Sequence, residues 1–214
     1  MAMRLEAVRV GRVTPLGPEQ VPSGYVKQTR VEPVTVSALG LMGDEQADLS
    51  VHGGPDKAVY GYAASHYATW RSEIPQHANL LVPGGMGENL TIAGVDEADL
   101  CIGDVHRIGT VTVQVCQPRQ PCFKLAAYFG DAKMPRAFLR SGRSGWYYRV
   151  LEAGTLCGGD DVQLLDRPQA FPFARLVAIV NGAAATAAEI AELARMPELA
   201  SSLREGFVTS NRYG

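Results

Sequence analysis

Residues 110–117, TVTVQVCQ, place the strongest constraint on the fold of this chain. Val111, Val113 and Val115 take every second position, and the residues between them are polar or carry sulfur. Because successive side chains of a strand point to opposite faces, this alternation predicts a β-strand with one apolar face. The 23 glycines and 13 prolines of the chain favour many short strands joined by tight turns. We therefore predict an α+β fold in which residues 1–167 form a β-barrel-like domain.

Helical patterns interrupt the strands and then dominate the end of the chain. His66, Trp70 and Ile74 have helical spacing, and a second helix is expected from about Pro121 to Phe129. After Pro168 the sequence becomes rich in alanine, with signals for a helix start near Thr186 and a break at Met196-Pro197. The composition predicts a small helical subdomain over residues 168–214.

Charge and hydropathy exclude several classes of function. Hydrophobic residues make up 46% of the chain and charged residues 20%, so a packed core is expected and disorder is not. The net charge of −2 gives no basic excess, and we expect no nucleic-acid partner. No apolar run approaches the ~20 residues of a membrane span. The first residues also lack the apolar core of a signal peptide, so a cytoplasmic protein without a membrane partner is expected.

The segment QPRQPCFKL, residues 117–125, contains the candidate reactive group. Pro121 suits the first position of a helix, which would place Cys122 in the first turn. Helix N-termini stabilise anions, and Arg119 and Lys124 add positive charge. These effects favour a thiolate, which attacks electrophiles and binds soft metals. The alternative is that Cys122 is a small buried hydrophobe, the common role of a free cysteine.

A second candidate contact lies at His52, which precedes GGPDK. The glycines let a ligand approach the backbone closely, and Lys57 supplies charge. The alternative is a plain tight turn. His77 and His106 are expected at ordinary surface positions, and no histidine has zinc-ligand spacing to a cysteine.

A third candidate segment is GRSGWYYRVLEAG, residues 142–154. Arg143 lies in a flexible turn, and Arg149 follows two tyrosines in an expected strand. Arginine forks suit phosphate, and aromatic faces suit a flat heterocycle. The alternative is an exposed strand with surface arginines.

Together these segments resemble the MOSC family, the domain related to the C-terminal part of molybdenum-cofactor sulfurases, and within it the bacterial YiiM type. The resemblance extends in order from about residue 45 to residue 167, and the tail is similar to the three-helix extension of this subgroup. The resembling stretches are VHGGPDKAVYGY, GENLTIAG, IGDVHRIG, VCQPRQPCFKL, GRSGWYYRVLEAG and GGDDVQLLDR.

The resemblance implies a β-barrel-like fold that binds a molybdenum cofactor of the molybdopterin type. In related proteins a cysteine at the position of Cys122 is a proposed molybdenum ligand or carries sulfur, so Cys122 is the candidate metal ligand and catalytic residue. The candidates to contact the cofactor are His52, Lys57, Arg119, Arg149 and Arg143.

The resemblance also implies partners. Relatives of the YiiM type are associated with reducing, and so detoxifying, N-hydroxylated bases and similar small molecules with electrons from a separate flavoprotein. This chain has no dinucleotide fingerprint and no iron–sulfur spacing, so it would need such a donor. The alternative is a carrier of the cofactor, or of persulfide sulfur, on Cys122. The tail could serve docking or formation of a homodimer. It is expected to be separable from cofactor binding, because residues 1–167 contain every candidate ligand.

Overall fold

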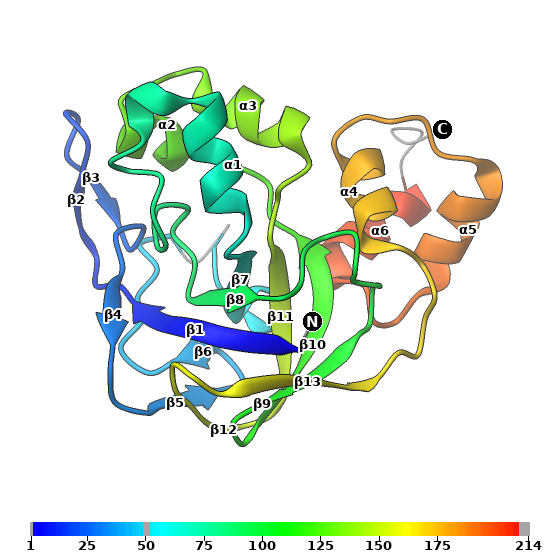
Figure 1. The fold of residues 1–214 in the computed structure, drawn as a ribbon. Helices are drawn as coiled ribbons and strands as arrows, with labels where there is room; N and C mark the ends of the chain where they lie inside the picture. Colours follow the sequence, from blue (N-terminus) through cyan, green and yellow to red (C-terminus); the bar gives the residue numbers. More distant parts are fainter. Residues whose placement is uncertain (1, 49–51, 210–214) are drawn as a thin grey trace.

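The computed structural model describes residues 2–48 and 52–209, and its centre is a closed β-barrel (Figure 1). Within the described residues, the strands of the ring are β1 (Met3–Val10), β7 (Val59–Ala63), β8 (Leu90–Ala93), β9 (Val105–Ile108), β10 (Val111–Pro118), β11 (Trp146–Glu152) and β13 (Asp161–Asp166). Their order is β13-β9-β10-β11-β7-β8-β1, and pairing of β1 with β13 closes the ring. The β7–β8 pair is parallel and the other pairs of the ring are antiparallel.

Shorter strands surround the ring. The strand β4 (Gln28–Arg30) pairs with the outer edge of β1. A hairpin is formed by β2 (Thr14–Leu16) and β3 (Val21–Ser23), and a small sheet by β5 (Val34–Ser37), β6 (Gly40–Leu41) and β12 (Gly154–Leu156). The closing segment of the barrel domain, residues 145–167, therefore contains three strands, β11, β12 and β13.

The interior of the barrel is the main hydrophobic core. Val111, Val113 and Val115 are fully buried in it, which confirms the face predicted from their alternation. The register of β10 on β11 shifts by one residue at Cys116, because Val115 lies opposite Tyr148 and Gln117 lies opposite Tyr147. Such a bulge re-aims the side chains that follow it. Gln117 consequently faces outward, where an undisturbed strand would have turned it into the core.

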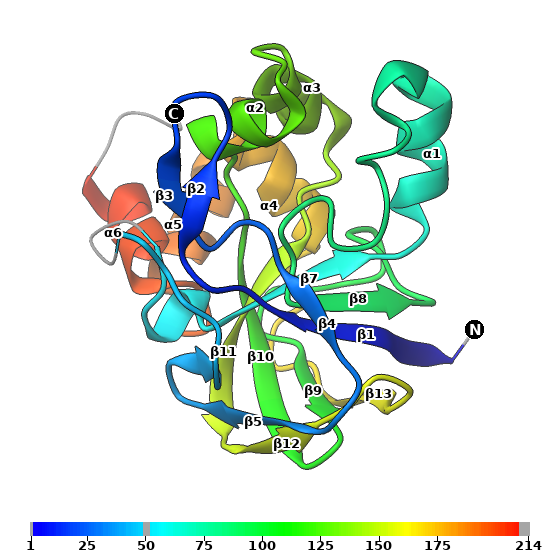
Figure 2. The ribbon, with the colours of Figure 1, turned by 90° about the vertical axis from the view of Figure 1, so that its left-hand side faces the viewer.

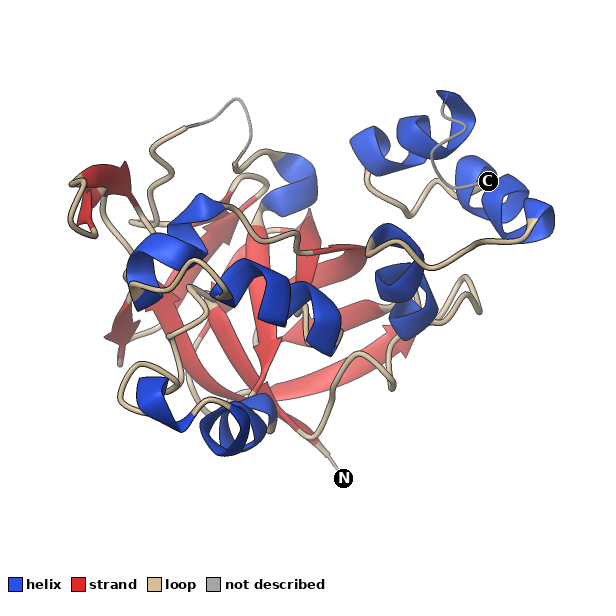
Figure 3. Ribbon diagram, turned by 90° about the horizontal axis from the view of Figure 1, so that it is seen from above, coloured by secondary structure: helices blue, strands red, loops and turns tan. Residues whose placement is uncertain are grey.

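Three helices cover the outer face of β7: α1 (His66–Glu73), α2 (Phe123–Phe129) and α3 (Met134–Ser141). Seen from above, the strands lie in the middle and the helices around them (Figure 3). Tyr60 and Tyr62 point outward from β7 and form a second apolar cluster with residues of these helices, among them Trp70 and Phe138. The predicted helix at 66–74 is confirmed, whereas α3 was not expected from the sequence. The short helices η1 (Pro55–Lys57) and η2 (Pro75–His77) lie in loops.

The C-terminal helices are α4 (Phe173–Val180), α5 (Ala187–Arg195) and α6 (Ser201–Thr209), grouped beside the barrel in Figure 1. Thr186 caps α5 and forms a capping box with Glu189, as the predicted helix start requires. Phe173 of α4 is fully buried and belongs to the same apolar cluster as the barrel interior. The predicted α+β class with a helical C-terminal part is confirmed, and the division into two units at residue 168 stays a prediction.

One expectation about the surface was wrong. His106 is only 1% exposed, and its Nδ1 lies 2.8 Å from the Tyr148 hydroxyl in the barrel interior. The local sequence around it, rich in glycine and charged residues, gave no sign of this burial. In the described part of the chain, no helix has the length and apolar character needed to cross a membrane.

Candidate functional site

A cleft of about 680 Å³ opens on the outside of the barrel at the end of β10. The β2–β3 hairpin and α2, which lie close together at this end of the molecule, form part of its wall (Figure 2). Other parts of the wall come from residues 44–48, 52–53, 57–58 and 117–121, and from single residues that include Tyr25, Lys27, Tyr60, Gly87, Asn89 and Tyr147. These segments are distant in the sequence and meet only because the barrel closes.

Cys122 lines this cleft and is the N-cap residue of α2. The helix begins at Phe123, two residues later than predicted, so Cys122 precedes the first turn. Its thiol is partly exposed and forms no hydrogen bond with any residue that the structure describes. Cys116 differs from it, because burial raises the pKa of the Cys116 thiol to about 12. Among the four free cysteines, Cys122 is therefore the one with a thiol presented to the cleft.

Positive charge is concentrated in the cleft wall behind Cys122. Arg119 is 6% exposed, and its guanidinium lies 4.8 Å from the centre of the Tyr60 ring and donates to the Met86 carbonyl. Lys124 is also buried, and neither cation forms an ion pair with a carboxylate of residues 2–48 or 52–209. A buried charge without a counter-charge is costly. An anionic ligand in the cleft would lower that cost.

His52 and Lys57 line the cleft, as their candidate roles require. Burial lowers the pKa of His52, and the positive charges of Lys124 and Lys57 lower it further. The imidazole is consequently neutral near pH 7, a state in which one ring nitrogen can accept a hydrogen bond.

Asp44 also lines the cleft, and its carboxylate connects several segments of the wall. Its carboxylate accepts hydrogen bonds from the Gly11 amide at 2.7 Å, from the Asn89 amide group at 2.9 Å, and from Lys27 and Gln46. Burial lowers the pKa of Lys27, and the Asp44 carboxylate opposes this shift. No spacing in the sequence connects these residues, so they were missed; only the closed barrel brings them together.

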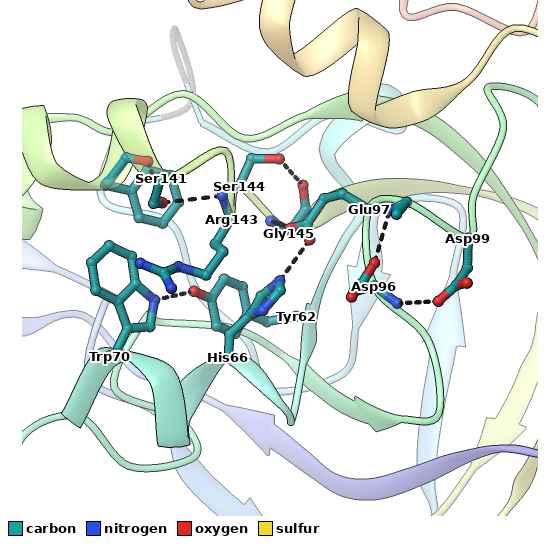
Figure 4. A network of polar contacts seen from close by, with 12 residues as sticks. Tyr62, His66, Trp70, Asp96, Glu97, Asp99, Ser141, Arg143, Ser144 and Gly145 are labelled. Atoms are coloured by element: carbon teal, nitrogen blue, oxygen red, sulfur yellow. Dashed lines mark hydrogen bonds and ion pairs between the residues drawn. The ribbon is translucent and has the colours of Figure 1, made fainter. Parts of the chain in front are cut away.

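Two of the predicted contacts do not line the cleft. Arg149 donates from Nε to Asp56 at 2.7 Å, and this carboxylate also accepts the backbone amide of the first residue of α6. Arg143 forms an ion pair with Glu73. Its guanidinium carbon lies 3.9 Å from the centre of the Trp70 ring, and Figure 4 shows these two residues side by side. Both arginines thus have a carboxylate partner outside the cleft, and the structure does not bring them together with Cys122.

The family model of the MOSC domain matches residues 48–163. The chain belongs to the MOSC domain family. Protein YiiM of Escherichia coli (strain K12) is 38% identical over 150 residues, which are 70% of this chain and 67% of YiiM. The crystal structure of YiiM from Geobacillus stearothermophilus aligns with a TM-score of 0.81 and 32% identity, over 96% of this chain and 97% of that one. The predicted family and its YiiM-type subgroup are confirmed.

A further relative is named a reductase. This protein of Gibberella moniliformis (strain M3125 / FGSC 7600) is 44% identical over 167 residues, which are 75% of this chain and 29% of that protein. The chain therefore matches less than a third of the fungal protein's length. Membership of the MOSC family supports a function related to the molybdenum cofactor. The name of this relative suggests that the function to test is a redox activity.

Proposed function

We propose that the cleft binds a molybdenum cofactor of the molybdopterin type and that Cys122 provides a thiolate ligand to its metal. The observation that carries this proposal is the Cys122 thiol, which has no hydrogen-bond partner among residues 2–48 and 52–209. It shares the cleft with Arg119 and Lys124, which have no carboxylate partner in these ranges. The described residues contain no group of three or more histidine, cysteine or acidic side chains that could hold a metal. A metal bound beside Cys122 would then take its other ligands from an organic molecule, and soft metals suit a thiolate.

The wall of the cleft fits the parts of such a cofactor. Its cations suit a phosphate group, and its tyrosine rings suit a flat pterin. Tyr60 and Tyr147 have ring centres 5.2 Å apart, and both line the cleft with Tyr25. The volume of about 680 Å³ is within the ~300–1,000 Å³ that small-molecule sites commonly have.

We infer that the activity is the reduction of N-hydroxylated bases or related small molecules. The bound cofactor would supply two-electron redox chemistry, and a separate flavoprotein would deliver the electrons. The residues of this chain would bind and orient: Arg119 and Lys124 attract the anionic part of the ligand, and Cys122 fixes the metal. The neutral His52 can donate a hydrogen bond from one ring nitrogen and accept one at the other without adding charge to the site.

The test uses protein purified from a host that makes the cofactor. Molybdenum and released pterin are measured per chain, and turnover of 6-N-hydroxylaminopurine is followed with a flavin reductase and NADH. Cys122→Ser should fold normally and lose molybdenum or turnover, because a serine hydroxyl is rarely ionised and is a harder ligand. Cys157→Ser is the matched control, since the Cys157 thiol contacts the Val31 carbonyl and does not line the cleft.

Wild-type metal content and turnover in the Cys122→Ser variant would exclude the ligand role. Protein that carries cofactor or Cys122 persulfide, transfers it to an acceptor enzyme and reduces no N-hydroxylated substrate would instead identify the carrier function.

A further inference from the structure

Tyr147 contributes a hydroxyl group to the cleft, and no residue that the structure describes uses it. Its hydroxyl forms no hydrogen bond with any residue in the described ranges, although the residue lines the cleft. The other tyrosines nearby differ: the Tyr60 hydroxyl donates to the Ser144 carbonyl at 2.9 Å, and the Tyr25 hydroxyl to the Gly85 carbonyl at 3.0 Å. A tyrosine hydroxyl carries one O–H donor and can also accept a hydrogen bond. The unused donor of Tyr147 is therefore available to a bound molecule.

The strand register explains why this side chain faces the cleft. Tyr147 lies opposite Tyr60 on one side and opposite Gln117 on the other, and all three residues line the cleft. Its neighbours Trp146 and Tyr148 point into the barrel and are fully buried. The ring of Tyr147 is also held, because it packs against Tyr60. The hydroxyl position is thus set by the sheet.

The charge state and surroundings of Tyr147 define the group that it can recognise. Burial raises the pKa of Tyr147, and the positive charge of Arg119 opposes this shift, whereas charge on Cys122 or Asp44 would add to it. The pKa stays above its usual value, so the phenol keeps its proton and donates. A neutral donor close to Cys122 complements a neutral oxygen at the reacting end of a ligand, whereas the buried cations Arg119 and Lys124 complement its anionic parts.

We propose that Tyr147 contacts the substrate and donates a hydrogen bond to the oxygen of its N–OH group, and so determines specificity for the N-hydroxylated form over the amine. This inference rests on the proposed function. In the balanced reaction, R–NH–OH takes up two protons and two electrons from the flavoprotein-fed cofactor, the N–O bond breaks, and R–NH₂ and H₂O form. The oxygen that accepts the hydrogen bond from Tyr147 is the one that leaves as water. The product amine lacks this oxygen and loses the contact.

The test is a binding measurement on the cofactor-loaded protein without an electron donor, so that no turnover occurs. The probes are 6-N-hydroxylaminopurine and 6-aminopurine, and the variant is Tyr147→Phe, which keeps the ring against Tyr60 and removes only the hydroxyl. The affinity for the N-hydroxylated purine should fall about tenfold, equivalent to about 1.4 kcal/mol, while the affinity for the amine stays constant. Tyr148→Phe is the control, because its hydroxyl contacts His106 inside the barrel, and it should change neither affinity.

The binding measurement separates the role of Tyr147 from the proposed function. A selective tenfold loss in Tyr147→Phe, with unchanged molybdenum and pterin content, supports the assignment. Equal affinities of wild type and Tyr147→Phe for the N-hydroxylated purine overturn the role of Tyr147 and leave the proposed function standing. Loaded wild-type protein that binds neither purine overturns the proposed function and the role of Tyr147 with it.

Discussion

His106 should make the stability of the barrel depend on pH in the mildly acidic range. The side chain is 1% exposed, and burial lowers its pKa to about 4; Arg167 adds to the shift and Asp104 opposes it. An unfolded chain would have a histidine pKa of about 6.5. Between these two values the unfolded state binds one proton more than the folded state. The free energy of unfolding must therefore fall as the pH falls, and no loss from this group is expected above the unfolded value.

The size of the effect follows from the two pKa values. A displacement of one pKa unit corresponds to about 1.4 kcal/mol. For a shift from about 6.5 to about 4, the contribution lost is about 1.4 kcal/mol at about pH 5.5 and about 2.5 kcal/mol at about pH 4.5. A loss of about 2.5 kcal/mol is a substantial fraction of the ~5–15 kcal/mol that stabilises a typical domain.

The assay is urea unfolding of wild type and His106→Gln at several pH values from about 7.5 down to about 4.5. Glutamine keeps a polar group near the Tyr148 hydroxyl and cannot titrate, so the variant has a different baseline and a shallower loss with pH. The quantity to compare is the difference between the two slopes, because all other titrating groups are shared. Equal slopes of the two proteins across this range would refute the reasoning.

Two more substitutions test the packing of the tail and the charge of the cleft. Phe173→Ala should lower the free energy of unfolding by about 3–5 kcal/mol, because the ring is fully buried in the barrel's apolar cluster. The unfolding transition of the whole molecule should shift with it. If the unfolding transition of the barrel stays in place, the tail folds independently. Arg119→Met should weaken binding of a phosphorylated pterin about ten- to a hundredfold, whereas Arg149→Met should weaken it much less, because Asp56 already neutralises Arg149. The two affinities are measured by titration at fixed ionic strength, and equal losses would contradict this distinction.

Local patterns in the sequence predicted the elements whose faces are set by periodicity. The valines of residues 110–117 needed only the alternation of a strand, and the helix at 66–74 only its 3.6-residue spacing. The capping box at Thr186 is likewise a signal of four consecutive residues. In each case the determining contacts lie within a few positions of the chain, which is why one sequence sufficed.

Local patterns could not predict residues whose role depends on strand pairing or on contacts between distant parts of the sequence. His106 is buried because β9 is paired on both sides, by β10 and β13, and those pairings lie outside its own segment. The bulge at Cys116 turns Gln117 outward, although the alternation of β10 pointed it inward. Asp44 joins residues up to 45 positions away along the chain. The sequence could place Cys122 in a cationic segment, but it could not show which cations remain unpaired.

The cleft differs from the other cationic sites of the described chain in the partners of its cations. Arg119 and Lys124 line the cleft and form no ion pair with a carboxylate of residues 2–48 or 52–209. Of the four cationic contacts that the sequence suggested for an anionic ligand, Lys57 and Arg119 line the cleft, whereas Arg143 and Arg149 do not. Arg143 and Arg149 each have a carboxylate partner, so a ligand would have to compete with that partner for the same guanidinium. Arg119 lies among aromatic rings and donates to the Met86 carbonyl, and because it is buried, little water screens its field. The attraction for an anion is therefore concentrated beside Cys122, where the only thiol of the described cleft wall is presented.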